Sequence, residues 1–148
     1  MNNNVIVIIG PTASGKSGLA LSLAETLHGK IISADSMQIY KGLDVGTAKA
    51  TVDEMKKVPH EMIDICSISE KFDVATYKKM CYDAIDRTIS DGFVPIVAGG
   101  TGLYINAVVN NVDFFEVDEE KTEAAEEMKN LSERKNNGRT LWVFVYYK

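Results

Sequence analysis

The sequence lacks the features that mark disulfide-bonded, metal-stapled or membrane-spanning proteins. It has only two cysteines, Cys66 and Cys81, which form no Cys-x-x-Cys pair and lie among apolar neighbours. We interpret them as reduced core thiols and not as a metal-binding or catalytic pair. No apolar run approaches the roughly 20 residues of a membrane-spanning helix, and the N-terminal Met-Asn-Asn-Asn lacks the basic region of a signal peptide. These absences predict a cytoplasmic protein with no membrane partner.

An excess of positive charge is also missing. The chain has 16 Lys and Arg against 21 Asp and Glu, which gives a net charge of −5. This balance provides no long-range attraction for nucleic acid, so any such site must be local or lie partly outside this chain. Hydrophobic residues make up 45% and charged residues 25% of the 148 residues, values typical of one globular domain with its own core. We expect a monomer.

Strand-like and helix-like segments alternate along residues 5–110. The expected strands are 5–9, 30–34, 60–65 and 94–98, and the expected helices are 16–28, a polar piece ending at Lys57, a helix from Asp73 to Gly92, and one beginning near Leu103. Gly29 follows the first helix, where a residue with positive φ is favoured. The alternation predicts an α/β fold with a parallel sheet flanked by helices.

Residues 1–112 and 113–148 differ in character. Residues 113–139 contain nine acidic and five basic side chains, and a thin apolar stripe predicts an exposed helix at 116–135. Residues 140–148 are aromatic and β-prone, with no element after them to pair or cover them. We therefore expect a core unit, followed by a charged helix and an atypical tail.

Residues 10–17, Gly-Pro-Thr-Ala-Ser-Gly-Lys-Ser, match the phosphate-binding pattern G-x-x-x-x-G-K-[ST] between a predicted strand and a predicted helix. The backbone N–H groups of such a loop converge on phosphate oxygens, and the helix N-terminus adds partial positive charge. Lys16 can neutralise a phosphate oxygen and Ser17 can ligate Mg²⁺. The motif predicts a P-loop NTPase-like fold. The predicted diphosphate-binding residues are Gly10, Pro11, Thr12, Ala13, Ser14, Gly15, Lys16 and Ser17.

The loop pattern indicates that a phosphate group binds, but it does not indicate which molecule carries that group. Its phosphates can belong to ATP, to another nucleotide or to an activated diphosphate, and a glycine-rich turn that binds nothing is the simplest alternative. In a doubly wound sheet, ligands gather at the carboxyl ends of the strands. Three segments are expected at that edge, namely 10–17, 35–40 and 99–104.

Three blocks carry a resemblance to a known family. They are GPTASGKS at 10–17, IISADSMQIYKGLDVGTAK at 31–49 and PIVAGGTGLYI at 95–105. Together they resemble the tRNA dimethylallyltransferases, also called isopentenyltransferases. VPHEMIDI at 58–65 is similar to the family as well, with Glu61 where a second histidine is usual.

The resemblance implies transfer of a dimethylallyl group from dimethylallyl diphosphate to N6 of the adenosine immediately 3′ of a tRNA anticodon. Diphosphate is released, with Mg²⁺ assisting, so the P-loop holds a leaving group. A primary allylic diphosphate ionises more readily when its developing charge meets backbone N–H groups, a lysine and a metal ion.

The resemblance also assigns site residues. Asp35 is the expected general base that orients the adenine amine and accepts its proton. Asp35, Ser36, Met37 and Gln38 form the tRNA-contact block, and Thr101 lies near both diphosphate and base. The adenosine must be flipped out of its loop to reach them.

Each assignment has a simpler alternative. Asp35 can cap a turn or hold Mg²⁺ through water, and Thr101 can be a helix N-cap. Thr47 and Lys49 can contact phosphate or backbone, or Lys49 can be merely solvated. We expect His60 to be structural, because it has no paired cysteine or carboxylate cluster around it in the sequence.

The rest of the chain departs from the family pattern. The family's helical insertion and basic C-terminal region are not recognisable, and the ending Leu-Trp-Val-Phe-Val-Tyr-Tyr-Lys looks like the product of a frameshift or premature stop. With such a truncation, diphosphate binding is expected to survive while tRNA prenylation weakens. Alternative functions are an adenylate isopentenyltransferase acting on AMP, ADP or ATP, a small-molecule P-loop kinase, and an inactive diphosphate-binding fragment.

Overall fold

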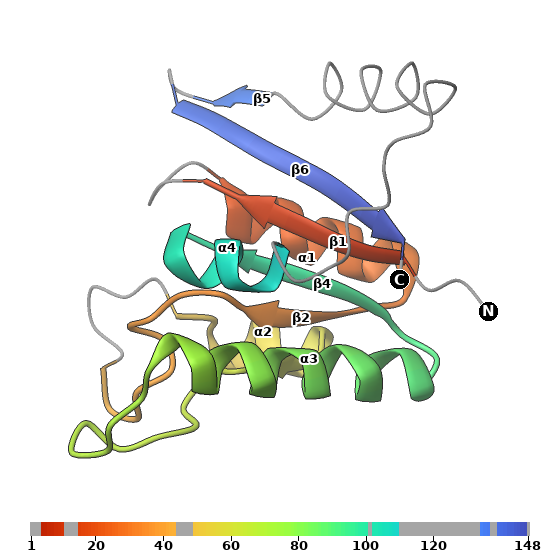
Figure 1. Cartoon of the computed structure of the whole chain (residues 1–148). Helices are drawn as coiled ribbons and strands as arrows, with labels where there is room; N and C mark the ends of the chain where they lie inside the picture. Colours follow the sequence, from red (N-terminus) through yellow and green to blue (C-terminus); the bar gives the residue numbers. More distant parts are fainter. Residues whose placement is uncertain are drawn as a thin grey trace.

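A six-stranded sheet in the order β3-β2-β4-β1-β6-β5 organises the chain (Figure 1). The computed structural model describes residues 4–10, 15–43, 49–100, 102–109, 134–136 and 139–147. The strands are β1 Asn4–Ile9, β2 Gly29–Ser33, β3 His60–Glu61, β4 Val94–Gly99, β5 Arg134–Asn136 and β6 Arg139–Tyr147. The helices are α1 Lys16–Leu27, α2 Val52–Lys57, α3 Val74–Ser90 and α4 Gly102–Val109. None of these described helices is long and apolar enough to cross a membrane.

The first four strands form the predicted parallel sheet. β4 lies between β1 and β2 and runs parallel to both, and β3 runs parallel to β2 on the outer side. The carboxyl ends of β2, β4 and β1 therefore share one edge of the sheet, which is where ligands gather in folds of this class. The α/β prediction is confirmed for this part of the chain.

Both faces of the sheet are buried at β1, β2 and β4, because successive strand residues point to opposite sides and are mostly apolar on both. On one face, Val5 and Val7 of β1 belong to a core shared with α3 and α4. On the other face, Ile6 and Ile8 pack in a core with Ala20 and Ala24 of α1. Figure 1 shows α3 and α4 lying along the sheet in this arrangement. The strands are thus held from both sides.

Two antiparallel strands extend the predicted parallel sheet. β6 pairs antiparallel with β1, from Asn4↔Tyr147 to Ile9↔Trp142, and β5 pairs antiparallel with β6. The tail thus pairs with β5 just before it and with β1, which is far away in the sequence. An unpaired strand edge exposes a row of N–H and C=O groups, and β6 covers that edge of β1.

The charged helix predicted at 116–135 is wrong at its end, since Arg134–Asn136 form β5. The remainder of that predicted helix lies outside the described residues. The third strand is also shorter than predicted, with two residues instead of the expected 60–65. Met62 and Asp64 take positive φ angles of 65° and 55°, which end the extended conformation.

The helix α3 confirms its prediction closely. The Asp73 carboxylate accepts a hydrogen bond from the Thr76 N–H at 2.8 Å and caps the N-terminus. The buried face consists of Tyr77, Cys81, Ala84, Ile85 and Thr88. Both cysteines are buried and unbonded to each other, and burial raises the pKa of Cys81 to about 11. They are core thiols, as predicted.

The end of α1 differs from the prediction by one residue. His28, and not Gly29, adopts the left-handed conformation, with φ 55°. Gly29 instead begins β2, where a Cβ atom would lie 2.8 Å from Ile96 Cδ1 and 3.1 Å from the Val94 carbonyl oxygen. The same Cβ would lie 3.1 Å from Ala24 Cα of α1, so glycine favours the close packing of the helix against the sheet.

We therefore predict that Gly29→Ala lowers the free energy of unfolding by about 1–3 kcal/mol, because the added methyl group overpacks this contact. Gly18→Ala is the matched control. A Cβ at Gly18 would meet nothing within 4 Å, so this helical substitution should stabilise the protein by about 0.4–1 kcal/mol. Urea unfolding of both variants measures the difference, and equal stabilities would contradict the packing argument.

Candidate functional site

Three backbone segments meet at the carboxyl edge of β2, β4 and β1. The Ala34 N–H, just after β2, donates to the Ala98 carbonyl of β4 at 2.8 Å. A Cβ at Gly99 would lie only 2.3 Å from the Ala34 carbonyl oxygen, so only glycine allows this approach. A Cβ at Gly100 would lie 3.1 Å from the Gly10 carbonyl oxygen and 3.6 Å from Lys16 Nζ. The predicted convergence of the three segments is therefore present.

The described end of the P-loop leads directly into α1. Gly15 precedes the helix with φ 87°, a conformation that favours glycine, and its carbonyl accepts from the Leu19 N–H at 3.0 Å. Lys16 is half-buried, and Ser17 is exposed in the first turn of α1. Burial lowers the pKa of the Lys16 ammonium, and the negative charge of Asp35 opposes that shift. The lysine and the carboxylate thus act on each other across the edge. Residues 11–14 lie outside the described residues.

Asp35 is half-buried at the end of β2, and its carboxylate is not turned into the core. One carboxylate oxygen, Oδ1, accepts a hydrogen bond from the Met37 N–H at 2.9 Å, which closes a tight turn. The turn-capping alternative is therefore realised. It coexists with an electrostatic interaction with Lys16, so a single carboxylate both shapes its loop and interacts with the start of α1.

Gln38 is tied to the core through a chain of hydrogen bonds. The Ser33 hydroxyl donates to Gln38 Oε1 at 2.8 Å, and the Tyr77 hydroxyl donates to the Ser33 carbonyl at 2.9 Å. Tyr77 is fully buried and stacks on Tyr104 with ring centroids 4.1 Å apart. This chain fixes the side-chain oxygen of Gln38. Met37 beside it is 48% exposed, an unusual position for a large apolar side chain.

Sequence reasoning missed Ser33 and Tyr77 as supports of this site. A sequence signal existed for Ser33, because it follows the apolar pair Ile31-Ile32 at the end of the strand, and the structure buries it to 2% exposure. A buried polar group must find a hydrogen-bond partner, so a serine at a strand's carboxyl end points to a neighbouring polar loop.

Among the other residues considered in the sequence, the structure shows the surroundings of Lys49 and His60. The side chain of Lys49 is 5% exposed, donates to the Tyr40 carbonyl at 3.0 Å and pairs with Asp64. The solvated alternative for this lysine is therefore wrong, and the backbone contact is confirmed. The His60 ring is half-buried with Nδ1 2.7 Å from the Val58 carbonyl, and burial lowers its pKa. Thr47 and Thr101 lie outside the described residues.

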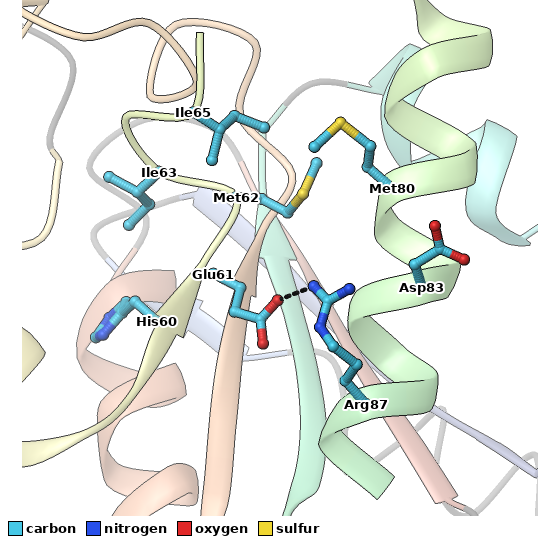
Figure 2. Close-up of a pocket in the computed structure, with 8 residues that line it drawn as sticks. All are labelled: His60, Glu61, Met62, Ile63, Ile65, Met80, Asp83 and Arg87. Carbon is cyan, nitrogen blue, oxygen red and sulfur yellow. Dashed lines mark hydrogen bonds and ion pairs between the residues drawn. The ribbon is translucent and has the colours of Figure 1, made fainter. Parts of the chain in front are cut away.

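A pocket of about 320 Å³ lies between β3 and α3 (Figure 2). It is lined by His60, Glu61, Met62, Ile63, Ile65, Met80, Asp83 and Arg87. Glu61 forms an ion pair with Arg87, also of the pocket, at 2.6 Å, and a second one with Lys30 of β2 at 3.1 Å. A carboxylate satisfied on both sides holds β3 and α3 together. The glutamate that stands in place of a histidine is thus part of a structural ion network.

We predict that Gly100→Ala weakens binding of inorganic diphosphate about tenfold, because the methyl group crowds the Gly10 carbonyl and the Lys16 ammonium. Gly29→Ala, at the amino end of β2, should leave this affinity unchanged in the folded protein. Isothermal titration calorimetry with both variants tests the difference. Wild-type affinity in folded Gly100→Ala would show that diphosphate binds elsewhere.

Comparison with known proteins identifies relatives of the chain. The sequence model of the IPP transferase family matches residues 38–143, which extends well past the predicted boundary at residue 112. The chain is 53% identical over 112 residues to a tRNA dimethylallyltransferase of Acetivibrio thermocellus, covering 76% of this chain and 36% of the relative. It is 48% identical over 129 residues to that of Caldanaerobacter subterraneus subsp. tengcongensis, covering 87% and 41%.

Solved structures that resemble this chain come from the same family. The full-length tRNA isopentenylpyrophosphate transferase of Bacillus halodurans superposes with a TM-score of 0.67 and 42% identity over 84% of this chain and 42% of its own. A eukaryotic dimethylallyltransferase acting on tRNA gives a TM-score of 0.68 and 33% identity over 82% of this chain and 32% of its own. The chain thus spans less than half the length of each of these relatives, over a shared P-loop NTPase-like α/β core. By both sequence and fold, it belongs to the IPP transferase family.

Proposed function

We propose that this chain carries the diphosphate-binding and base-orienting part of a tRNA dimethylallyltransferase. The reaction moves a dimethylallyl group from dimethylallyl diphosphate to N6 of the adenosine 3′ of a tRNA anticodon. One observation carries the proposal: Lys16, Asp35 and Gly100 meet at the carboxyl edge of the sheet. The printed names of the relatives, which are tRNA dimethylallyltransferases, support the choice of reaction. A cytoplasmic location and a monomeric state belong to the same proposal.

The diphosphate half of the site would stabilise a leaving group. The dipole of α1 points its positive end at the edge, and Lys16 adds a full charge. As the allylic C–O bond breaks, its electron pair moves to the diphosphate oxygen, and both groups stabilise that charge more strongly than in the ground state. Gly100 leaves room for the anion beside Lys16 because it has no side chain.

The acceptor half would align the adenine amine. Asp35 orients the N6 amine, and its carboxylate accepts the proton as the C–N bond forms. An exocyclic amine is too weakly acidic to ionise first, so proton transfer accompanies bond formation. Ser36, Met37 and Gln38 would contact the flipped adenosine, with exposed Met37 offering an apolar surface. By the family resemblance, Thr101 would act near both the diphosphate and the base.

The residues at this edge also fit a magnesium ion. Mg²⁺ prefers hard oxygen ligands and keeps several waters. The exposed Ser17 hydroxyl in the first turn of α1, with diphosphate oxygens, would provide that kind of donor set, and Asp35 would contact the ion through water. When bound, the ion would neutralise negative charge on the diphosphate.

We predict that Asp35→Asn lowers the rate of prenyl transfer by about 10²–10⁴-fold, because asparagine cannot accept the proton. Binding of dimethylallyl diphosphate should persist, since Lys16 and α1 are unchanged. Asp53→Asn is the control, as Asp53 lies in the exposed first turn of α2. The assay uses labelled dimethylallyl diphosphate, Mg²⁺ and unmodified tRNA, with AMP in a parallel reaction.

Label in tRNA that depends on Asp35 supports the proposal. Label in AMP and not in tRNA would reassign the chain to the adenylate isopentenyltransferases. An Asp35→Asn variant as fast as the wild type would remove Asp35 from the mechanism. No label in either acceptor, with diphosphate binding intact, would show that the chain binds its diphosphate without catalysing transfer.

A further inference from the structure

The segment Asp64–Cys66 holds the proposed base-contact loop in place. The Asp64 N–H donates to the Gln38 carbonyl at 3.0 Å, and the Ile65 N–H donates to the Ile39 carbonyl at 2.8 Å. In the reverse direction, the Lys41 N–H donates to the Cys66 carbonyl at 2.9 Å. Tyr40 and Cys66 form a parallel bridge. The position of residues 35–41 therefore depends on the position of this segment.

Lys49 also joins residues 35–41 to the segment Asp64–Cys66, through its side chain. Its ammonium donates to the Tyr40 carbonyl at 3.0 Å and forms an ion pair with the Asp64 carboxylate. The lysine side chain is 5% exposed, whereas that of Asp64 is 43% exposed. Burying an ammonium group is unfavourable unless it is paired and hydrogen-bonded. Lys49 therefore gains its stability from these contacts, which join the loop to the segment.

The backbone at the start of this segment and two residues before it is strained. Met62 has φ 65° although its side chain is 4% exposed, and Asp64 has φ 55°. A left-handed conformation is unfavourable for a bulky residue such as methionine and less so for aspartate. Such strain persists only where the surrounding contacts determine the conformation, and it occurs most often near functional sites. The Lys49–Asp64 pair is one of these determining contacts.

We propose that Lys49 is a positioning residue for prenyl transfer. Its ammonium clamps the Tyr40 carbonyl to the Asp64 carboxylate and thereby fixes the loop that carries Asp35 and Gln38. It does not ligate phosphate, because its charge is buried and directed to Asp64. The inference rests on the proposed function for its kinetic consequence, although the clamp itself is observable without activity.

The test compares Lys49→Leu with Lys30→Leu. Lys30 is a matched control because it is also largely buried, 13% exposed, and paired with a carboxylate, but it lies at the amino end of β2. Loss of the clamp misplaces the base-orienting loop, and a misplacement of about 1 Å can cost about 10²-fold in rate. We expect kcat for tRNA to fall by about that factor in Lys49→Leu, with the Kd of dimethylallyl diphosphate unchanged. Lys30→Leu should keep the wild-type kcat.

A second readout needs no activity. Methyl NMR of protein labelled at the methionine ε-carbons should show shifted signals for Met37 and Met62 in Lys49→Leu, with the Met55 signal in α2 unchanged. Asp64→Asn should shift the same signals, since asparagine tolerates the positive φ but breaks the ion pair. The double variant should show little further change, because both substitutions remove one interaction. Asp64→Asn also tests the pair if Lys49→Leu does not fold.

Three results would overturn the inference. The first is loss of diphosphate binding in Lys49→Leu, which would make the lysine a phosphate ligand. The second is an unchanged Met37 signal with activity lost only in proportion to the unfolded fraction, which would make it a stability residue alone. The third is additive change in the double variant. Absence of prenyl transfer in the wild type would instead refute the proposed function, and the NMR comparison would still decide the clamp.

Discussion

The close approach of backbone segments at one edge of the sheet is the constraint on which the site depends. Gly99 lets β4 come within contact of the Ala34 carbonyl after β2, and Gly100 lets the next residue lie against Gly10 and Lys16. A side chain at Gly99 would push the segments apart, and one at Gly100 would crowd the Gly10 carbonyl. Because they are close, a lysine at the start of α1 and a carboxylate at the end of β2 interact electrostatically. The site is therefore a consequence of backbone packing.

The two apolar cores make that packing rigid. The strands β1, β2 and β4 contribute buried side chains to both faces of the sheet, so neither β2 nor β4 can shift without opening a cavity. The buried Tyr77 extends this rigidity to the edge through its hydrogen bond to the Ser33 carbonyl, and Ser33 in turn fixes Gln38. Loops on a rigid scaffold hold functional groups in defined positions, and these loops follow that rule.

Three lysines of this chain have similar surroundings and different uses. Lys16, Lys30 and Lys49 are all partly or largely buried, and each lies near a carboxylate. Lys30 and Lys49 form ion pairs that join neighbouring segments of the chain. Lys16 instead lies at the glycine-lined edge at the N-terminus of a helix, where an anion is favoured. Position in the fold, and not residue type, distinguishes the lysine that we propose to bind diphosphate from the two structural ones.

The sequence by itself determined most of the local elements and indicated the ligand group that we propose. Apolar periodicity and caps such as Asp73 predicted the helices, and the P-loop pattern with its glycines predicted a diphosphate edge, because these signals act over a few residues. Only the tertiary structure decided that β6 covers β1 in antiparallel register, that His28 takes the strained position beside Gly29, and that Lys49 is buried against Asp64. Each of these depends on contacts between residues distant in the chain or on competition for space between packed elements, and local sequence patterns contain no information about either.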